Sequence, residues 1–416
     1  MAPFALVDDL GKLGAYLIYL LIGMAFGATL EVSGFANSRK LANQFYLRDM
    51  TVLKVMFTGI ITAMVLIFLA AAFGLLAFND LYVPPTYLWP GIVGGLIMGV
   101  GFILGGFCPG TSLVALGSLK VDGLFFFLGT LSGVLVFEET VGFFDNFWYS
   151  SYMGRFLLPE WLGISTGLTV LLIVVMALGA FWLAEKAERV FGPGVGDAKP
   201  IRRPIRLAAA GGLVVLAGLV MGMGQPSPLQ KYGFVSHEKD ALLLERQVQI
   251  HPGELIQVAA NREMKLVLLD VRNERDFNLF HLVDSRRAPL EELARGALTR
   301  ALLDEPPNAV VILVSNDETE ATEAWKMLTG EGIMNLYILE GGINGWLDLF
   351  ADEGACPAGC RPTPEAAGEG ELSWQFDAAL GDQPPIANPD LFADQAFEFT
   401  PKVKLEVKAR PAGGCG

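Results

Sequence analysis

The sequence has little charge for its length. Of 416 residues only 18% are Asp, Glu, Lys or Arg, whereas 52% are hydrophobic. A soluble globular protein has about a quarter charged residues. This composition excludes a disordered chain, a nucleic-acid-binding protein and an ordinary cytosolic enzyme. Residues 1–224 carry 13 basic and 13 acidic residues, whereas residues 225–416 carry 17 and 31. We therefore expect an apolar part and an acidic, water-soluble part that join near residue 225.

Residue types needed for metal binding are also scarce. The chain has three histidines and four cysteines. His237 and His251 lack neighbours with the spacing of metal ligands. No nucleotide-binding motif occurs, which argues against ATP-driven pumping. We expect neither a cofactor nor a metal, and no nucleic-acid partner.

Six stretches are long and apolar enough for membrane helices. A bilayer core needs about 20 mostly apolar residues per helix. The stretches are residues 13–33, 52–78, 88–118, 122–138, 162–184 and 207–224. The third is too long for one straight span and contains Cys108-Pro109-Gly110, so we expect it to be broken there. No cleavable signal is evident, and the first stretch is interpreted as a retained anchor. Residues 1–224 are therefore predicted to form a polytopic helical domain in the inner (plasma) membrane.

Basic residues predict the side of the membrane on which each loop lies, because Lys and Arg stay in the cytoplasm. Most of them occur between the first two spans, at Lys120 and in the loop before the last span, whereas the opposite side holds only Lys12 and Arg155. With six spans, this distribution places the N-terminus and everything after residue 224 outside the cytoplasm, in the periplasm.

The membrane part contains an internal repeat. Four residues, Gly23, Gly27, Gly34 and Phe35, recur 72 positions later as Gly95, Gly99, Gly106 and Phe107. Each copy, near residues 13–78 and 88–138, has a glycine-spaced span, an interrupted Gly-Phe segment, a basic turn and a second span. Transporters built from repeats often bind their ligand where discontinuous helices meet. The spaced glycines also allow close helix packing, which is an equally good explanation of them.

The second copy is interrupted at Gly106–Ser112. A break in a membrane helix leaves backbone N–H and C=O groups without hydrogen-bond partners, and lipid cannot supply them. The break should therefore line an enclosed or water-filled cavity. Pro109 suits the first turn of a new helix, whose N-terminus favours a small anion. Cys108 adds a polarisable sulfur. The predicted substrate-binding residues are Cys108, Pro109, Gly110, Thr111 and Ser112, and the expected ligand is a sulfur-containing oxyanion.

The first copy offers different groups at the corresponding place. Ala36 stands at the position of Cys108 and is followed by Asn37, Ser38 and Arg39, which supply an amide, a hydroxyl and a cation. These three are predicted as further substrate-binding residues. Glu31 is ionisable within a span, so it is either functional or paired with the basic residues at positions 39 and 40.

The run Gly105–Thr111 within duplicated, glycine-rich spans resembles the YeeE/YedE membrane family, whose characterised members take up thiosulfate. The resemblance covers residues 13–138 and implies a transporter or channel for thiosulfate or a related small sulfur-containing anion. Several membrane cysteines of that family are thought to pass thiosulfate along. Cys108 matches one of them, but no other cysteine precedes Cys356, so the resemblance does not extend to a relay of several thiols.

Residues 225–352 alternate between strand and helix patterns. Short apolar runs at 266–269, 310–314 and 335–339 are typical of buried strands, and residues 290–303 and 321–328 have helical composition. This alternation predicts a C-terminal α/β domain with a parallel sheet and helices on both faces. Three segments resemble the rhodanese family: Leu269–Arg272 with Asp276-Phe277 and Phe280–Leu282, the run 310–314, and Leu339–Trp346. The resemblance implies a rhodanese-like fold.

A rhodanese carries its nucleophilic cysteine directly after the middle strand. The residue must be a cysteine because sulfur transfer needs a thiolate that can become a persulfide. Comparing the patterns puts Val314 at that position. A shift by one residue would offer Ser315, whose hydroxyl cannot carry persulfide sulfur. Asp317 and Glu318 add negative charge where the substrate is negative, and residues 225–355 contain no cysteine. We therefore predict an inactive sulfurtransferase whose role is binding or docking.

Residues 353–416 are predicted to form an extended tail rich in Pro, Ala, Gly and acidic residues. Outside the cytoplasm, Cys356 and Cys360 could form a disulfide. No histidine follows them, which excludes a haem-attachment motif. The Gly413–Gly416 end is similar to the swinging arm of sulfur-oxidation carrier proteins, which implies a sulfur carrier at Cys415. A flexible end, or a link to a partner chain, is the alternative.

Two functions are compatible with these patterns. The first is a membrane transporter or channel for thiosulfate or a related anion, which is not an enzyme and has lipid and the anion as partners. The second is a structural or docking subunit of a larger redox or sulfur-metabolising complex, with protein partners at the rhodanese-like domain and the tail.

Overall fold

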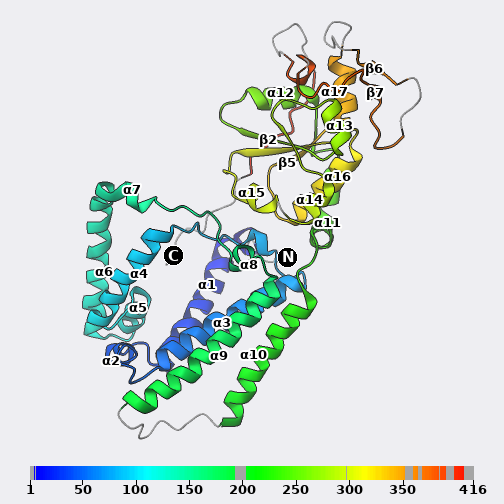
Figure 1. Ribbon diagram of the computed structural model, residues 1–416. Helices are drawn as coiled ribbons and strands as arrows, with labels where there is room; N and C mark the ends of the chain where they lie inside the picture. Colours follow the sequence, from blue (N-terminus) through cyan, green and yellow to red (C-terminus); the bar gives the residue numbers. More distant parts are fainter. Residues whose placement is uncertain are drawn as a thin grey trace. The chain divides into compact units, whose positions relative to one another are not determined.

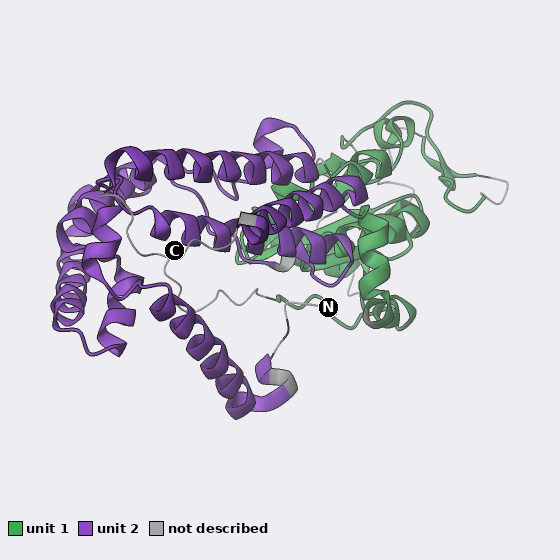
Figure 2. Cartoon of the chain, turned by 90° about the horizontal axis from the view of Figure 1, so that it is seen from below, with its two compact units in different colours: residues 1, 226–411 green, residues 2–225, 412–416 purple. Residues whose placement is uncertain are grey.

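The computed structural model describes residue 4 and residues 6–192, 203–296, 298–351, 359–363, 368–383, 385–389 and 398–406. The chain divides into two compact units, built essentially from residues 2–225 and 226–411 (Figure 2). The first unit consists of helices and their connections, and the second holds the two β-sheets.

Six long apolar helices dominate the first unit (Figure 1). They are α1 (Leu6–Val32), α3 (Thr51–Ala72), α4 (Leu88–Gly105), α6 (Val121–Thr140), α9 (Thr166–Phe191) and α10 (Arg203–Met223). At about 1.5 Å of rise per residue, each is long enough to cross most or all of a bilayer core. Within the described part of the chain, the prediction of six helices long and apolar enough to span a membrane is confirmed, and the chain is a multi-pass membrane protein whose helices contact lipid.

Short helices follow the first long helix of each repeat. α2 (Ser38–Asn43) follows α1, and α5 (Pro109–Gly117) follows α4. The order of long, short and long helix therefore occurs twice, as α1–α2–α3 and α4–α5–α6, in agreement with the internal repeat. The remaining connections contain η1 (Phe78–Asp80), η2 (Val141–Phe144), α7 (Asp145–Trp148) and α8 (Leu158–Leu162).

Helices α3, α9 and α10 share a core of small and branched residues. Its buried members are Ile61, Val65, Val170, Val174, Ala177, Ala217 and Val220. Gly167 on α9 lies against the backbone of α10, because a Cβ at this position would collide with the Cα of Met221. Small residues allow membrane helices to approach this closely.

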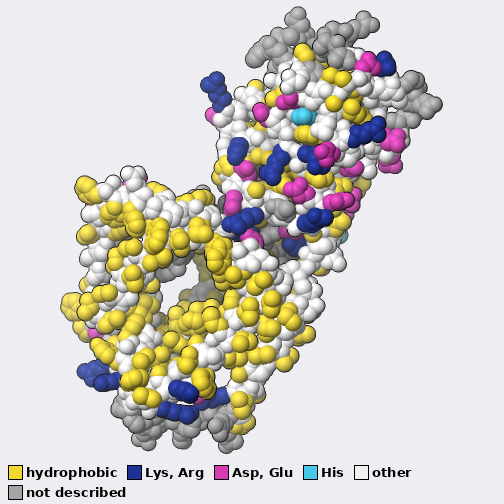
Figure 3. All heavy atoms as spheres, in the orientation of Figure 1, with side chains coloured by type: hydrophobic (Ala, Val, Ile, Leu, Met, Phe, Trp, Pro, Cys, Tyr) yellow, Lys and Arg dark blue, Asp and Glu magenta, His cyan; other side chains and the backbone are white. Residues whose placement is uncertain are grey.

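Lys and Arg side chains gather at one end of the helical unit, whereas apolar side chains cover most of the rest of its visible face (Figure 3). At that end, Lys54 Nζ lies 2.6 Å from Glu188 Oε2 and joins the start of α3 to the end of α9. Arg206 at the start of α10 pairs with Glu185 on α9. The loops that the basic residues assign to the cytoplasm thus meet through ion pairs at one end.

The second unit is built on a five-stranded parallel sheet in the order β1-β5-β4-β2-β3. The strands are β1 (Gln249–Ile250), β2 (Lys265–Asp270), β3 (Ser285–Arg287), β4 (Ala309–Val314) and β5 (Leu336–Leu339). The helices are α11 (Pro228–Leu244), α12 (Pro252–Ala260), α13 (Glu274–Leu279), α14 (Leu290–Ala294), α15 (Thr299–Leu303), α16 (Thr319–Gly330) and α17 (Gly342–Phe350).

Side chains of β4 alternate between two cores, one on each face of the sheet. Val310, Ile312 and Val314 join α12 and α17 in one core, and Val311 and Leu313 join α11, α14, α15 and α16 in the other. Successive residues of a strand point to opposite faces. The predicted parallel sheet with helices on both faces is therefore confirmed.

The described parts of the tail pack onto this same unit. β6 (Arg361–Pro362) pairs antiparallel with β7 (Trp374–Gln375), and η3 (Pro385–Ala387) follows. Trp374 and Ile386 are buried in the core formed by α12 and α17. Further on, Glu254 Oε1 accepts hydrogen bonds from the N–H groups of Lys402 and Val403, both 2.7 Å long. The described tail segments thus lack long regular elements but are held in place.

Candidate functional site

The second repeat is interrupted between α4 and α5, as the Pro-Gly sequence predicts. Gly106 ends α4 in the left-handed region with a φ of 71°, which glycine adopts readily. A Cβ there would lie 3.0 Å from the carbonyl oxygen of Ser38. Cys108 is extended, and Pro109 is the first residue of α5, where its missing N–H costs nothing.

Cys108 caps the N-terminus of α5. Its Sγ accepts a hydrogen bond from the N–H of Thr111 (3.4 Å), and the Thr111 hydroxyl lies 3.3 Å from the same sulfur. In return, the N–H of Cys108 donates to Thr111 Oγ1 (2.9 Å). The thiol is free and half-buried. The N–H of Gly110 has no acceptor among the described residues, so one donor at the start of α5 remains open.

The other predicted residues of this segment support the cap. Thr111 and Ser112 are buried. The Ser112 hydroxyl donates to the carbonyl oxygen of Pro109 (2.7 Å), inside the first turn of α5. Ser112 therefore lines the start of the helix but has its hydrogen already engaged.

Asn37 does in the first repeat what Cys108 does in the second. It is the N-cap of α2, and its Oδ1 accepts from the N–H groups of Arg39 (3.1 Å) and Lys40 (3.4 Å). The capping residues thus correspond at a spacing of 71, one position from the Ala36 indicated by the glycine spacing of 72. The structure brings Asn37 and Ser38 to the first break. Arg39 is exposed.

The two breaks lie against each other. Phe35 and Ala36 of the first and Phe107 of the second are each 1% exposed and belong to one apolar cluster with Leu41 and Ala115. The predicted meeting of the discontinuous segments is therefore present within this unit.

Glu31 has a partner that the sequence did not indicate. Its Oε2 accepts a 2.7 Å hydrogen bond from Ser118 Oγ at the end of α5, and the carbonyl oxygen of Val114 is a second, more distant acceptor for the same hydroxyl (3.0 Å). Lys40 instead donates from Nζ to the carbonyl oxygen of Ser33 (2.8 Å). No ion pair of Glu31 with Arg39 or Lys40 occurs among the described residues.

The spaced glycines of α1 and α4 are not in a helix contact. A Cβ placed on Gly23, Gly27, Gly95 or Gly99 would meet nothing within 4 Å among the described residues. Close packing within this unit therefore does not account for these four positions.

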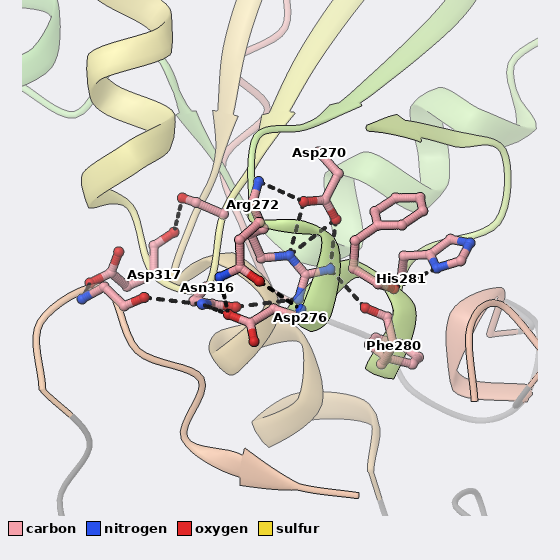
Figure 4. A network of polar contacts seen from close by, with 11 residues as sticks. Asp270, Arg272, Asp276, Phe280, His281, Asn316 and Asp317 are labelled. Carbon is pink, nitrogen blue, oxygen red and sulfur yellow. Dashed lines mark hydrogen bonds and ion pairs between the residues drawn. The ribbon is translucent and has the colours of Figure 1, made fainter. Parts of the chain in front are cut away.

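In the α/β unit, a buried polar network surrounds the loop after β4 (Figure 4). Asp270 and Arg272 are fully buried, and Arg272 Nη2 lies 2.6 Å from Asp270 Oδ2. The guanidinium also donates to the carbonyl oxygen of Phe280 (2.7 Å) and to Asn316 Oδ1 (3.3 Å). Asn316 Nδ2 in turn donates to Asp276 Oδ2 (2.9 Å). This network fixes the backbone of the loop to β2 and α13.

Val314 is the last residue of β4, and its side chain lies in the apolar core. Ser315 is the first residue of the loop. Its hydroxyl donates to the carbonyl oxygen of Asp317 (2.7 Å) and accepts from the N–H of Ala321 in α16 (3.1 Å). The side chain at the centre of the turn is thus that of Ser315, the alternative that differs from Val314 by one residue.

Asp317 fills the start of α16 with its own carboxylate. Oδ1 accepts from the N–H of Thr319 (2.8 Å), and Oδ2 accepts from the Thr319 hydroxyl (3.0 Å) and the N–H of Gly370 (2.8 Å). Burial alone would raise the pKa of Asp317, but these hydrogen bonds outweigh burial and lower the pKa. An anion at this helix N-terminus would meet a fixed negative charge.

Glu318 adds a second carboxylate at the edge of the loop. It accepts from the N–H of Gly341 (2.9 Å) and pairs with Arg246, whose Nη2 also lies 3.1 Å from Glu340. The Glu318 hydrogen bond outweighs desolvation and, with the Glu340 contact, raises the pKa of Arg246. Arg246 is therefore already shared between two carboxylates.

A tail segment, residues 368–375, crosses this loop and is named the strap. Besides the bond from Gly370 to Asp317, Asn316 Nδ2 donates to the carbonyl oxygen of Gly370 (3.0 Å). Asn344 at the start of α17 accepts from the N–H of Ser373 (2.7 Å) and donates to the carbonyl oxygen of Glu371 (2.9 Å). Sequence reasoning missed the strap, because its residues show no motif that pairs them with the loop.

The remaining predicted residues concern cysteines and metals. Cys360 is disulfide-bonded, whereas Cys356 and Cys415 lie outside the described residues, so the pairing of Cys356 with Cys360 stays a prediction. Among the described residues, no group of three or more His, Cys, Asp and Glu side chains could hold a metal ion.

These features define a polytopic membrane protein with a repeated, interrupted helix pair, joined to a parallel α/β domain of rhodanese type. Residues 33–227 match the sulphur transport family, and residues 253–349 match the rhodanese-like domain. The membrane part of the chain thus matches the sulphur transport (YeeE/YedE) family, and the C-terminal part belongs to the rhodanese-like family.

Two curated relatives resemble the C-terminal part. Thiosulfate sulfurtransferase GlpE of Pseudomonas savastanoi pv. phaseolicola is 31% identical over 97 residues, which are 23% of this chain and 87% of the relative. The centrosomal protein of 41 kDa of Danio rerio is 29% identical over 105 residues, 24% of this chain. The chain covers only 28% of that relative's length. No solved structure is significantly similar to the chain.

Proposed function

We propose that the protein moves thiosulfate, or a related small sulfur-containing anion, across the inner membrane. The match to a sulphur transport family supports the class of cargo. The observation that carries the proposal is the break before α5, where a free thiol, an open N–H and a helix N-terminus occur together. A helix N-terminus favours an anion, and the polarisable sulfur of Cys108 suits the outer sulfur of thiosulfate.

The proposed binding residues contact different atoms of the anion. Cys108 would contact the sulfur atom, and the N–H of Gly110 with the Thr111 hydroxyl would contact an oxygen. Pro109 and Ser112 shape the first turn. Asn37, Ser38 and Arg39 would supply the amide, hydroxyl and cation of the first repeat.

Uptake of labelled thiosulfate into proteoliposomes tests this proposal. Cys108→Ala should lower the initial rate by about tenfold, the effect of losing roughly 1.4 kcal/mol of binding. Gly110→Ala is a finer probe, because its Cβ would lie 4.0 Å from Cys108 Sγ, in ordinary contact, and would narrow access to the thiol. Ser132→Ala is the matched control, since its hydroxyl bonds only within α6, to the carbonyl oxygen of Leu128. An unchanged flux in Cys108→Ala would remove the proposal.

For the rhodanese-like domain we propose a role in docking without sulfur transfer. Residues 225–355 contain no cysteine, and Asp317 holds a carboxylate at the helix start where an anionic sulfur donor would bind. The full chain should therefore transfer no sulfur from thiosulfate to cyanide. A Cys108→Ala/Cys415→Ser variant is the control, because Cys108 and Cys415 are thiols outside the rhodanese-like domain that could react. Transfer that persists in this variant would contradict the docking role.

The basic loops support a periplasmic position of the α/β unit and the tail. Membrane-impermeant labelling of a cysteine placed in an exposed part of that unit, on intact and on broken cells, tests this orientation. Labelling of intact cells is expected once the outer membrane is made permeable. Labelling only after lysis would reverse the orientation.

A docking subunit of a larger redox or sulfur-metabolising complex is the second candidate function. It is favoured by the strap, in which the chain's own tail packs against the loop after β4 and the start of α17. Purification in a gentle detergent decides it, because a docking subunit should retain a stoichiometric partner. Cys415 as a sulfur carrier is tested separately by intact mass after incubation with thiosulfate, where an unmodified C-terminal peptide would count against it.

A further inference from the structure

Two reciprocal hydrogen bonds tie the repeats together beside the breaks. Ser118 Oγ at the end of α5 donates to Glu31 Oε2 at the end of α1 (2.7 Å). Ser38 Oγ at the start of α2 donates to Asp122 Oδ2 at the start of α6 (3.0 Å). Each bond joins a serine of one repeat to a carboxylate of the other.

A lysine adds a third connection. Lys120 Nζ, just before α6, donates to the carbonyl oxygen of Ala36 in the first break (2.9 Å). The last carbonyl oxygens of a helix have no partner within the helix. Lys120, in the second repeat, therefore donates to a carbonyl just beyond the end of α1 in the first repeat. Lys40, in the first repeat, donates to another carbonyl in the same region.

The bonds of Ser118 to Glu31, Ser38 to Asp122 and Lys120 to Ala36 are together named the junction. The burial of its residues differs from that of an ordinary core contact. Ser38, Ser118 and Lys120 are half-buried, whereas Glu31 and Asp122 are exposed. Hydrogen bonds at such partly solvated positions are individually weak, because water competes for both partners. Three of them together can favour one arrangement of the repeats and still be broken at thermal energies.

The junction adjoins the apolar contact between the two breaks, because the Lys120 bond ends on Ala36, a member of that cluster. Phe35 and Phe107 are each 1% exposed and lie in the cluster shared by the two breaks. Passage along this contact requires the breaks to separate. Repeat-built transporters commonly alternate access by rocking one repeat against the other.

We propose that Glu31, Ser38, Ser118, Lys120 and Asp122 form a gate between the two repeats, which opens each time the cargo passes. Apart from Ser38, which is also a proposed binding residue, they are positioning residues, because they act by holding the two breaks together. This inference rests on the proposed transport function and adds to it the element that controls access.

Reversible cross-linking of the full chain in proteoliposomes tests the gate. Glu31 and Ser118 are both changed to cysteine and bridged with a short bifunctional methanethiosulfonate reagent. The reference is Ser118→Cys alone, treated identically, which also accounts for reaction at Cys108 and the other native thiols. Bridging should lower thiosulfate uptake by about tenfold relative to this reference, and dithiothreitol should restore it. Equal rates in the bridged protein and the reference would overturn the gate.

Ser118→Ala gives a second measurement that does not depend on the cross-link. A gate residue should change the maximal rate by about threefold or more while the KM for thiosulfate stays within about twofold, because it acts on opening rather than on binding. Ser132→Ala should change neither quantity. If Ser118→Ala keeps the wild-type rate and KM, as Ser132→Ala should, the junction is a static contact and the gate is refuted. Absence of uptake in the wild-type protein would instead refute the transport function itself.

Discussion

Asp317→Ala should loosen the strap locally without unfolding the domain. The Asp317 carboxylate accepts the N–H of Gly370 at 2.8 Å, one of two bonds that join the tip of the strap to the loop after β4; the other runs from Asn316 Nδ2 to the carbonyl oxygen of Gly370 (3.0 Å). The rest of the strap has its own anchors. Asn344 holds Ser373 and Glu371, and Trp374 Nε1 donates to Asp348 Oδ1 (3.0 Å).

The magnitude follows from the loss of one hydrogen bond to a charged acceptor. Such bonds contribute about 1.5–3 kcal/mol in a protected site. Asp317 is partly exposed, and solvent screening reduces this to about 1–2 kcal/mol. A loss of that size raises the population of the open strap about 5–30-fold.

Hydrogen exchange of the full chain in detergent micelles measures this opening. Exchange at the Gly370 amide should accelerate by about 5–30-fold. The Ser373 amide, which Asn344 holds, should change less. Amides of β4 should keep their protection, because that strand is buried in both cores. Asp382→Ala is the matched control, since this tail carboxylate bonds only the side chain of its neighbour, Gln383.

Two results would refute this reasoning. Unchanged exchange at Gly370 would mean that the carboxylate does not hold the strap. Faster exchange throughout β4 would mean that Asp317 stabilises the whole domain and that the strap is not a separate element.

Three further outcomes are expected. Hydrogen bonds lower the pKa of Asp317, so its carboxylate stabilises the closed strap fully above the unfolded-state pKa of about 3.9. This stabilisation is lost as the pH falls through the lower folded-state pKa, and the protection of the strap amides against hydrogen exchange should fall over that range. Arg272→Met should destabilise the α/β unit by about 3–5 kcal/mol, since it leaves Asp270 buried without a counter-charge, and chemical denaturation should show a smaller loss when Asp270 is also replaced by leucine. Gly167→Leu should lower the thermal stability of the detergent-solubilised protein, because its side chain collides with the backbone of α10, whereas Gly179→Leu on the same helix meets open space.

The spans and the position of the break could be predicted because they depend on local sequence. A run of apolar residues specifies a membrane helix, and the Pro109-Gly110 pair stops α4 and starts α5 within a few positions. The parallel sheet was likewise predictable from short apolar runs between helical segments.

The contacts between the repeats were less predictable, because they depend on residues far apart in the sequence. The sequence leaves Glu31 as either a functional residue or a partner of the basic residues at positions 39 and 40, whereas the structure pairs it with Ser118, 87 residues away. The equivalence of Asn37 with Cys108 was displaced by one position, since the glycine spacing drifts between the start and the end of the repeat. Only the cap geometry identifies which residues correspond.

The strap and the position of Ser315 in the loop could not be inferred from local patterns. The strap is joined to the loop by single hydrogen bonds from backbone atoms, such as that of Gly370, which any sequence could supply. Val314 and Ser315 differ by one position, and only the burial of Val314 in the core shows which side chain faces the turn.

The N-termini of α5 and α16 offer opposite environments to an anion. At α5 the cap is the Cys108 thiol, Pro109 has no N–H, and the N–H of Gly110 has no acceptor among the described residues, so a donor at the positive end of the helix dipole stays open. At α16 the cap region holds the Asp317 carboxylate, which takes up the first N–H of the helix and supplies the negative charge itself. The same backbone feature is therefore available to an external anion in the membrane part and occupied from within in the rhodanese-like part. This difference, more than the absence of a cysteine alone, is the physical reason for our proposal that the membrane helices handle sulfur and that the C-terminal domain docks.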